Sequence, residues 1–229
     1  MVAFKKLLIT AIALALSNVA FAQMYGAILC KDPNFFCHIA KRGDTWQKLF
    51  SDASERELVM KLNRVNIPIY TGMKIAIPKG NDHNVLDYSP LPTQIDAPGE
   101  KTIIVSLKVL AWGAYNANGQ LLNWGPASGG QGYCPDIHRG CHTVTGKFAV
   151  YHKEGRGCFS RKFPVGRGGA PMPYCMFFHG GFALHGSYIV PGYNASHGCV
   201  RMFVNDAQWL NQEFLANDLN VPVIVKGSS

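Results

Sequence analysis

One cysteine in the last third of the chain stands between a histidine and an arginine. Cys199 follows His197 and Gly198 and precedes Val200 and Arg201 in a glycine-containing segment. A cysteine attacks a carbonyl as its thiolate, and a free thiol is mostly protonated at neutral pH. Neighbouring cationic groups lower the pKa of a thiol and make it a nucleophile. The segment therefore predicts a nucleophilic cysteine.

His185 lies 14 residues before Cys199, after an apolar run. A histidine can accept the thiol proton near neutral pH and return it to a leaving group. No acidic residue is close in sequence, so we expect a backbone carbonyl at Gly186 or Ser187 to orient the ring. Gly198 permits a tight turn, and we expect its amide to face the oxyanion of a tetrahedral intermediate.

Two neighbours of the cysteine have alternative interpretations. Arg201 is a planar donor suited to a substrate carboxylate, or to fixing its own loop. His197 either contacts substrate or hydrogen-bonds to the loop. Taken singly, a lone histidine is usually structural and a lone buried cysteine is usually inert. It is the combination of these residues that indicates catalysis.

Seven cysteines in an exported chain indicate three disulfides and one free thiol. Proximity favours the pairs Cys30–Cys37, Cys134–Cys141 and Cys158–Cys175, which leaves Cys199 free. A zinc site is the alternative for the histidine-containing cluster Cys134, His138, Cys141 and His142. An oxidising compartment favours the disulfide, and we expect no metal and no cofactor.

The first 22 residues have the pattern of a secretory signal. Lys5 and Lys6 precede a short apolar run, and Ala20-Phe21-Ala22 is a small-x-small cleavage site. The run is too short to span a bilayer, and Cys30 lies too far downstream for a lipoprotein cysteine. We therefore expect export to the periplasm or envelope of a bacterium, with no stable membrane anchor.

The composition is that of a folded, basic protein. Hydrophobic residues make up 48% of 229, and the formal net charge is +8, or +6 without the two signal lysines. A basic surface suits an anionic partner such as a cell wall. Because no block of lysine and arginine occurs, we expect no nucleic-acid partner.

Residues 36–79 have the pattern strand, two helices, strand. Asp44 is the expected cap of the first helix, Ser54 to Glu57 form a capping box, and residues 73–77 alternate as a strand. This module resembles the lysin motif (LysM), which binds glycans containing N-acetylglucosamine. The resemblance implies glycan contacts from two loops, at Gly43, Asp44, Thr45, Asn66 and Ile67. A packing module without a ligand is the alternative.

Short strands dominate after Lys101. Apolar or β-branched runs predict strands near 102–109, 111–115, 120–124, 148–152, 176–184 and 221–225, with a hairpin turn at Asn118-Gly119. Asp206 is expected to cap the one helix. The pattern predicts a mainly β domain, sandwich-like or barrel-like. We divide the chain into a signal (1–22), an N-terminal region (23–80), a proline-containing linker (81–99), a β domain (100–226) and a tail (227–229).

The β domain resembles the L,D-transpeptidase catalytic family. The resemblance is carried by His185-Gly186, the spacing to Ser196-x-Gly198-Cys199-x-Arg201, residues 143–148, and residues 169–174 with Phe177. Val144 stands where the family has proline. The family implies a β-sandwich in which Cys199 is the nucleophile, His185 the base, and the substrate-binding residues are Ser196, His197, Arg201, Tyr174 and Met172.

The resemblance implies a reaction on peptidoglycan. Cys199 attacks the carbonyl of the third stem-peptide residue, a terminal D-alanine leaves, and an amine takes up the acyl group. Water in place of the amine would make the chain an L,D-carboxypeptidase. Arg161, Lys162 and Arg167 form either a basic lid or a solvated loop.

Two other functions were considered. One is a catalytically silent wall-binding protein whose cysteines are all structural. The other is a papain-like cysteine protease, which is disfavoured because the histidine here precedes the cysteine.

Overall fold

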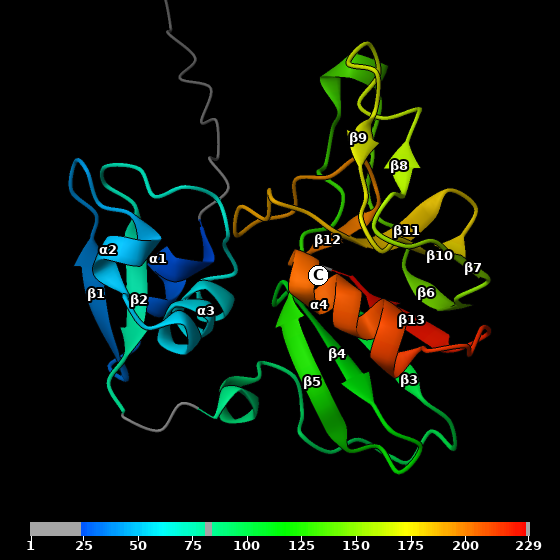
Figure 1. The fold of residues 1–229 in the computed structure, drawn as a ribbon, viewed down its shortest axis with the longest axis horizontal. Coiled ribbons are helices and arrows are strands. Elements are labelled where there is room, and N and C mark those ends of the chain that lie inside the picture. The colour runs from blue at the N-terminus through cyan, green and yellow to red at the C-terminus, as the bar shows by residue number, and fades with distance from the viewer. Residues whose placement is uncertain (1–23, 81–83, 228–229) are drawn as a thin grey trace, which may run out of the picture.

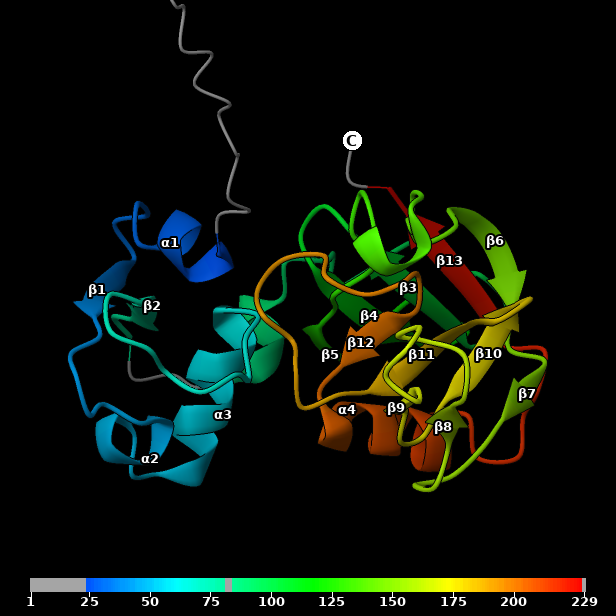
Figure 2. The ribbon, with the colours of Figure 1, turned by 90° about the horizontal axis from the view of Figure 1, so that it is seen from above.

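The computed structural model describes residues 24–80 and 84–227. The expected signal segment lies outside them. Figure 1 shows a small N-terminal module (24–80) beside a larger β-rich domain (84–227), the C-terminal domain, and Figure 2 shows the same pair from above. No helix in the described part of the chain is long and apolar enough to cross a membrane.

The N-terminal module has two antiparallel strands flanked by short helices. Asn63 ties helix to strand, because its side-chain amide bonds to the carbonyls of Val59 and Ala76 and accepts from the Ala76 amide. A disulfide joins Cys30 to Cys37. The elements are α1 (Tyr25–Leu29), β1 (Phe35–Ile39), α2 (Trp46–Leu49), α3 (Ala53–Leu62) and β2 (Lys74–Pro78).

Between β1 and β2, the two helix caps differ from our predictions. Thr45, not Asp44, caps α2, because its side chain accepts from the Lys48 amide. Asp44 instead accepts from the Lys41 amide and pairs with His38. Asp52, just before the expected capping box, caps α3 through the Glu55 amide. Each cap thus lies one or two residues from its expected position.

The C-terminal domain contains a five-stranded sheet in the order β5-β4-β3-β13-β6. β13 is parallel to β3 and antiparallel to β6, and the other pairs are antiparallel. Most of its strands carry β-branched or aromatic residues that pack on the core. The strands are β3 (Thr102–Ser106), β4 (Ala111–Tyr115), β5 (Leu121–Pro126), β6 (Gly146–Ala149) and β13 (Pro222–Lys226).

A four-stranded sheet in the order β12-β11-β10-β7 carries the segments of interest. Its strands are β7 (His152–Lys153), β10 (Met176–His179), β11 (Phe182–Gly186) and β12 (Val200–Met202). β11 and β12 are parallel, so Leu184 lies opposite Val200 and His185 opposite Arg201. The main core, which includes Trp112, Met176, Leu184 and Met202, has members from both sheets and from α4 (Val204–Trp209), whose end continues as a π-helical turn, Leu210–Phe214.

A small hairpin, β8 (Phe159–Ser160) with β9 (Ala170–Pro171), stands above the four-stranded sheet in Figure 1. Two disulfides brace this end of the domain, Cys134–Cys141 and Cys158–Cys175. With Cys30–Cys37 they are the three pairs that proximity favoured. Short 3₁₀ turns occur at Val85–Tyr88 and Pro135–Ile137.

Three further predictions for the C-terminal domain need correction. The apolar run 176–184 is two strands, because the pair Gly180-Gly181 turns the chain. Asp206 is buried inside the first turn of α4, and Phe203 holds the cap position. The described part of the expected linker, 84–99, packs on β4 and β5: Leu91 is buried there, and the Tyr115 hydroxyl donates to the Pro92 carbonyl.

Candidate active site

A cavity of about 780 Å³ opens at the C-terminal end of β11 and the start of β12. It is lined by His185 of β11, Arg201 of β12 and Cys199 just before β12, and by residues of the β8–β9 hairpin and of the loop 137–142. The parallel pairing of β11 with β12 brings the first three side chains into one space. Cavities of this size hold small ligands and peptide segments.

Cys199 is the one cysteine of the seven without a disulfide, and all seven lie in described parts of the chain. Its Sγ lies 3.6 Å from the carbonyl oxygen of Gly181, to which a thiol donates. Burial raises the pKa of the Cys199 thiol, although the backbone N–H of Ala183 and the charge of Arg201 act in the opposite direction. The thiol is therefore neutral at rest, whereas we expected its neighbours to ionise it.

His185 is 6% exposed, and its Nδ1 lies 2.9 Å from the Gly186 carbonyl oxygen. A carbonyl only accepts, so Nδ1 carries the proton and Nε2 is left as the basic nitrogen. Burial lowers the pKa of His185 to about 4, which the Gly186 carbonyl partly opposes. The imidazole is therefore neutral at pH 7 and is oriented as expected.

The turn before Cys199 is tied by its own polar groups. The Ser196 hydroxyl accepts from the Gly198 amide and donates to the Cys199 carbonyl. Gly198 has φ 122°, and a Cβ there would lie 2.7 Å from the ring of Phe182. Because its amide is bonded to Ser196, Gly198 is not placed as an oxyanion donor, which corrects its expected role. Ser196 lines the cavity, and its hydroxyl also ties the turn.

Thr143 is a buried residue of this site whose role the sequence did not reveal. Its hydroxyl donates to the Gly198 carbonyl at 2.7 Å and accepts from the Gly130 amide at 2.8 Å. Thr143 thereby joins the turn to the loop after β5. The one sequence feature that could have indicated this role is the position of Thr143 at the start of the motif at residues 143–148.

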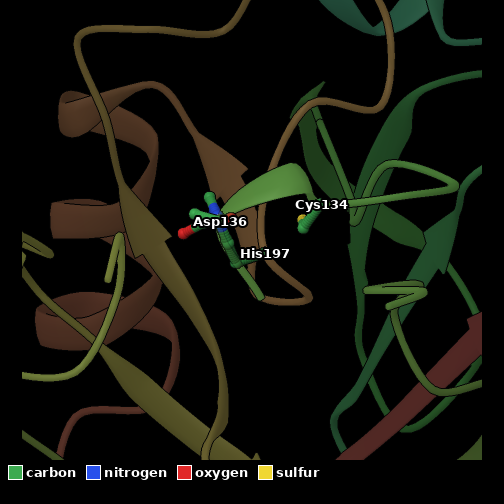
Figure 3. A group of neighbouring side chains, drawn as sticks. All are labelled: Cys134, Asp136 and His197. Carbon is green, nitrogen blue, oxygen red and sulfur yellow. The ribbon is translucent and has the colours of Figure 1, made fainter. Parts of the chain in front are cut away.

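His197 lines the cavity and pairs with Asp136, with Nε2 2.9 Å from both carboxylate oxygens. Figure 3 shows the two side chains meeting beside Cys134. The ring of Phe163 stacks on His197 at 5.7 Å between centroids. The bond to His197 holds the pKa of Asp136 below its usual value. The pair links the catalytic turn to the loop above it, and sequence gave no signal for Asp136.

Cys134, Asp136 and His197 bring ligand-type atoms close together, as do Glu154, Cys158 and Cys175. In each group the sulfur atoms belong to disulfides. A disulfide sulfur is not a thiolate ligand. The zinc alternative for Cys134 and Cys141 is therefore wrong.

Arg201 lines the cavity, and the one hydrogen bond of its guanidinium to the described residues is a long contact, 3.5 Å to the Ile189 carbonyl. Most of its donors remain open to a ligand carboxylate. Met172 also lines the cavity, as expected, but Tyr174 does not: it packs in the main core with φ 58°. Arg161 and Lys162 lie on the cavity wall, which favours the lid interpretation of their segment.

The residues expected to contact glycan divide into two groups. Gly43 lies in an exposed turn beside Asp44 and Thr45. Asn66, in contrast, uses its amide on the C-terminal domain: Nδ2 donates to Ser187 O and Oδ1 accepts from Val190 N, both at 2.7 Å. The Ile67 carbonyl accepts from the Trp46 indole. For Asn66, an interdomain contact replaces the expected glycan contact.

The comparison with family models gives one match, the L,D-transpeptidase catalytic domain (YkuD), over residues 100–225. This span is more than half of the chain and contains every residue of the cavity. The chain belongs to the L,D-transpeptidase family. It is thus an L,D-transpeptidase, an enzyme class that acts on peptidoglycan outside the cytoplasm.

One solved structure supports the fold, and a second is similar at a lower score. The L,D-transpeptidase from Xylanimonas cellulosilytica DSM 15894 (residues 123–326) is 23% identical with a TM-score of 0.55, and the match covers 75% of this chain and 79% of that one. An L,D-transpeptidase from Stackebrandtia nassauensis is 25% identical, with 62% of each chain covered and a TM-score of 0.48. Comparison with the curated proteins gave no match.

Proposed function

We propose that this L,D-transpeptidase uses Cys199 as nucleophile and His185 as base to transfer a stem-peptide acyl group to an amine. The observation that carries the proposal is that the one free thiol and the oriented imidazole share a cavity. Two neutral groups can react by passing the proton as the sulfur attacks. No preformed ion pair is needed.

The reaction has two halves. Sγ attacks the carbonyl carbon of the third stem residue while the thiol proton moves to Nε2 of His185. The tetrahedral intermediate expels the amine of D-alanine, which takes that proton, and a thioester remains on Cys199. An acceptor amine then attacks the thioester, gives its proton to Nε2, and the proton returns to sulfur as the new amide forms.

The other cavity residues hold the substrate. The open guanidinium of Arg201 is suited to the carboxylate of the leaving D-alanine, and its charge favours anionic sulfur. Met172 offers an apolar wall, and Arg161 and Lys162 add positive charge on the hairpin side. His197 acts through the loop that contains Asp136, because their pair joins that loop to the turn before Cys199.

Two alternatives use the same chain differently. An L,D-carboxypeptidase would transfer the acyl group to water on the same residues. A non-catalytic wall-binding protein would not need a free thiol in a cavity, so the state of Cys199 argues against it. Export is compatible with either alternative, since three disulfides indicate an oxidising compartment.

The N-terminal module is proposed to bind glycan at its exposed loop. From β1 to β2 the module has the order strand, helix, helix, strand, and β1 pairs with β2 in antiparallel fashion. Both features fit the lysin-motif pattern. Gly43, Asp44 and Thr45 form the loop that remains free of the C-terminal domain. Substituting that loop should weaken pull-down by purified peptidoglycan.

The deciding experiment incubates the protein with a disaccharide-tetrapeptide. Mass spectrometry should show loss of D-alanine, an acyl adduct on the peptide containing Cys199, and a cross-linked dimer. A tripeptide product without dimer would identify the carboxypeptidase. No adduct and no product, with Cys199 reduced, would refute the catalytic proposal.

A further inference from the structure

The loop that joins His185 to Cys199 begins with a turn gripped by the N-terminal module. Asn66 brackets this turn, donating to Ser187 O and accepting from Val190 N, and its own amide N donates to Val190 O. Inside the turn, the Ser187 hydroxyl accepts from the Ile189 amide. The turn backbone is therefore fixed from two sides.

Tyr188 stands at the apex of this turn and is 69% exposed, the largest value among the large hydrophobic residues that the structure describes. A rigid backbone that presents a bare aromatic ring has already lost the entropy that binding would otherwise cost. Exposure of the Tyr188 ring makes no contribution to folding. Its placement is typical of a ligand contact.

Tyr188 also separates two hollows. On one side is the active-site cavity; on the other is a hollow of about 370 Å³ between the module and the C-terminal domain. Tyr188 lines both. The view from above shows the loop after β11 reaching toward α3, with α4 beside it (Figure 2). A ligand can therefore lie across Tyr188 with one end at Cys199 and the other between the domains.

The second hollow has mixed chemistry. Met60, Phe203 and Val204 give it an apolar floor, while Glu57 and Asn205 are exposed polar residues at its edge. The Asn205 side chain has no hydrogen-bond partner within residues 24–80 and 84–227, and Glu57 pairs through one oxygen only, with Lys61 at 3.3 Å. Free amide and carboxylate groups beside an apolar surface can satisfy hydroxyl and acetamido groups.

We propose that this interdomain hollow, with Tyr188 as its wall, is a saccharide subsite for an N-acetylhexosamine of the glycan strand that carries the reacting stem peptide. The C–H face of the sugar packs on the Tyr188 ring, the acetyl group meets the apolar floor, and Asn205 and Glu57 bond to polar substituents. The module serves as one wall of the substrate site. This inference rests on the proposed function for its substrate, but its binding test does not.

The binding test uses the Cys199→Ala protein, which cannot react, and chitotetraose as probe. Tyr188→Ala should weaken binding in calorimetry at least ~5-fold, the loss expected for about 1 kcal/mol of contact energy, and Tyr188→Phe should retain it. Wild-type affinity in Tyr188→Ala overturns the proposal, whatever substitution of the loop 43–45 does to binding. This arm gives an answer even if the chain catalyses nothing.

The kinetic test compares a disaccharide-tetrapeptide with the free tetrapeptide. Asn205→Ala should raise KM for the first relative to KM for the second by at least ~3-fold, as loss of one hydrogen bond predicts. Gln208→Ala, an exposed amide farther along α4, is the matched control and should keep the wild-type ratio. An unchanged ratio in Asn205→Ala, or an equal change with both substrates, overturns the proposal.

Discussion

Two pairs of titratable groups contrast within one molecule. His185 is buried and Cys199 is half-buried in the cavity wall, and desolvation moves both pKa values toward the neutral form. Lys61 of α3 and Asp206 of α4 are also buried, 5% and 3% exposed, yet they form an ion pair of 3.0 Å across the domain interface. Burial acts to lower the pKa of Lys61, but the charges and hydrogen bonds of Asp206 and Glu57 outweigh it and raise that pKa.

The difference lies in whether an opposite charge is close enough to offset burial: Lys61 lies 3.0 Å from Asp206, whereas the charge of Arg201 does not offset the effect of burial on the Cys199 thiol. Burial raises the pKa of Asp206 to about 6 even against the attraction of Lys61, so the pair is ionised at pH 7 without being a strong source of stability. The active-site pair has no carboxylate beside it, so its charges appear only as substrate reacts. One pair fixes the interface, and the other remains uncharged until it is used.

Removing the nucleophile gives the largest expected effect. Cys199→Ala should reduce product formation by at least ~10³-fold, because no other free thiol exists among the seven cysteines. Product is measured by mass spectrometry. Peptidoglycan pull-down should match wild type, since the proposed glycan contacts lie elsewhere. Wild-type turnover in this variant would refute the assignment of Cys199.

Breaking the interface pair comes next. Lys61→Met leaves Asp206 buried without its cation and should lower the free energy of unfolding by about 3–5 kcal/mol, measured by urea denaturation. Lys31→Met is the matched control, because Lys31 is exposed in the same module.

The double variant Lys61→Met/Asp206→Leu separates charge from packing. It should recover much of the stability lost in Lys61→Met, since no unpaired charge remains. A double variant as unstable as the single one would show that the lysine acts through packing alone, and the comparison between the two pairs would fail.

Much of the C-terminal domain could be predicted from sequence because its signals are local. Strands such as Thr102–Ser106 and Pro222–Lys226 are β-branched runs. The division of 176–184 was hidden because apolar residues flank Gly180-Gly181 on both sides. The role of Asp206 was beyond prediction, because its partner Lys61 belongs to a different domain.

In the active site, too, local features could be predicted from sequence and features that depend on the fold could not. A motif and its spacing were enough to select Cys199 and His185, and the Gly186 carbonyl is a neighbour in sequence. Whether the thiol is ionised depends on burial, which needs the fold, and so the expected lowering of its pKa became a rise. Tyr174 was misplaced because a motif position does not specify which way a side chain faces.

Replacing the base tests the other half of the active-site pair. His185→Ala should slow acylation by ~10²-fold or more, the typical contribution of a positioned general base. Acylation is followed as burst formation of the thioester by mass spectrometry. His152→Ala, an exposed histidine outside the cavity, serves as control. An acylation rate in His185→Ala equal to that of the control would remove His185 from the mechanism.

The pH dependence of alkylation needs no substitution, and it tests directly whether the resting pair is neutral. With the pKa of Cys199 raised and that of His185 near 4, thiolate is scarce at neutral pH and increases about tenfold per pH unit. The rate of iodoacetamide reaction, measured from pH 5 to 9, should therefore rise throughout. A resting thiolate–imidazolium pair would instead give a plateau through neutral pH, because its thiolate would already be formed. Observing that plateau would show that Cys199 and His185 are ionised at rest, as Lys61 and Asp206 are, and the contrast between the two pairs would fail.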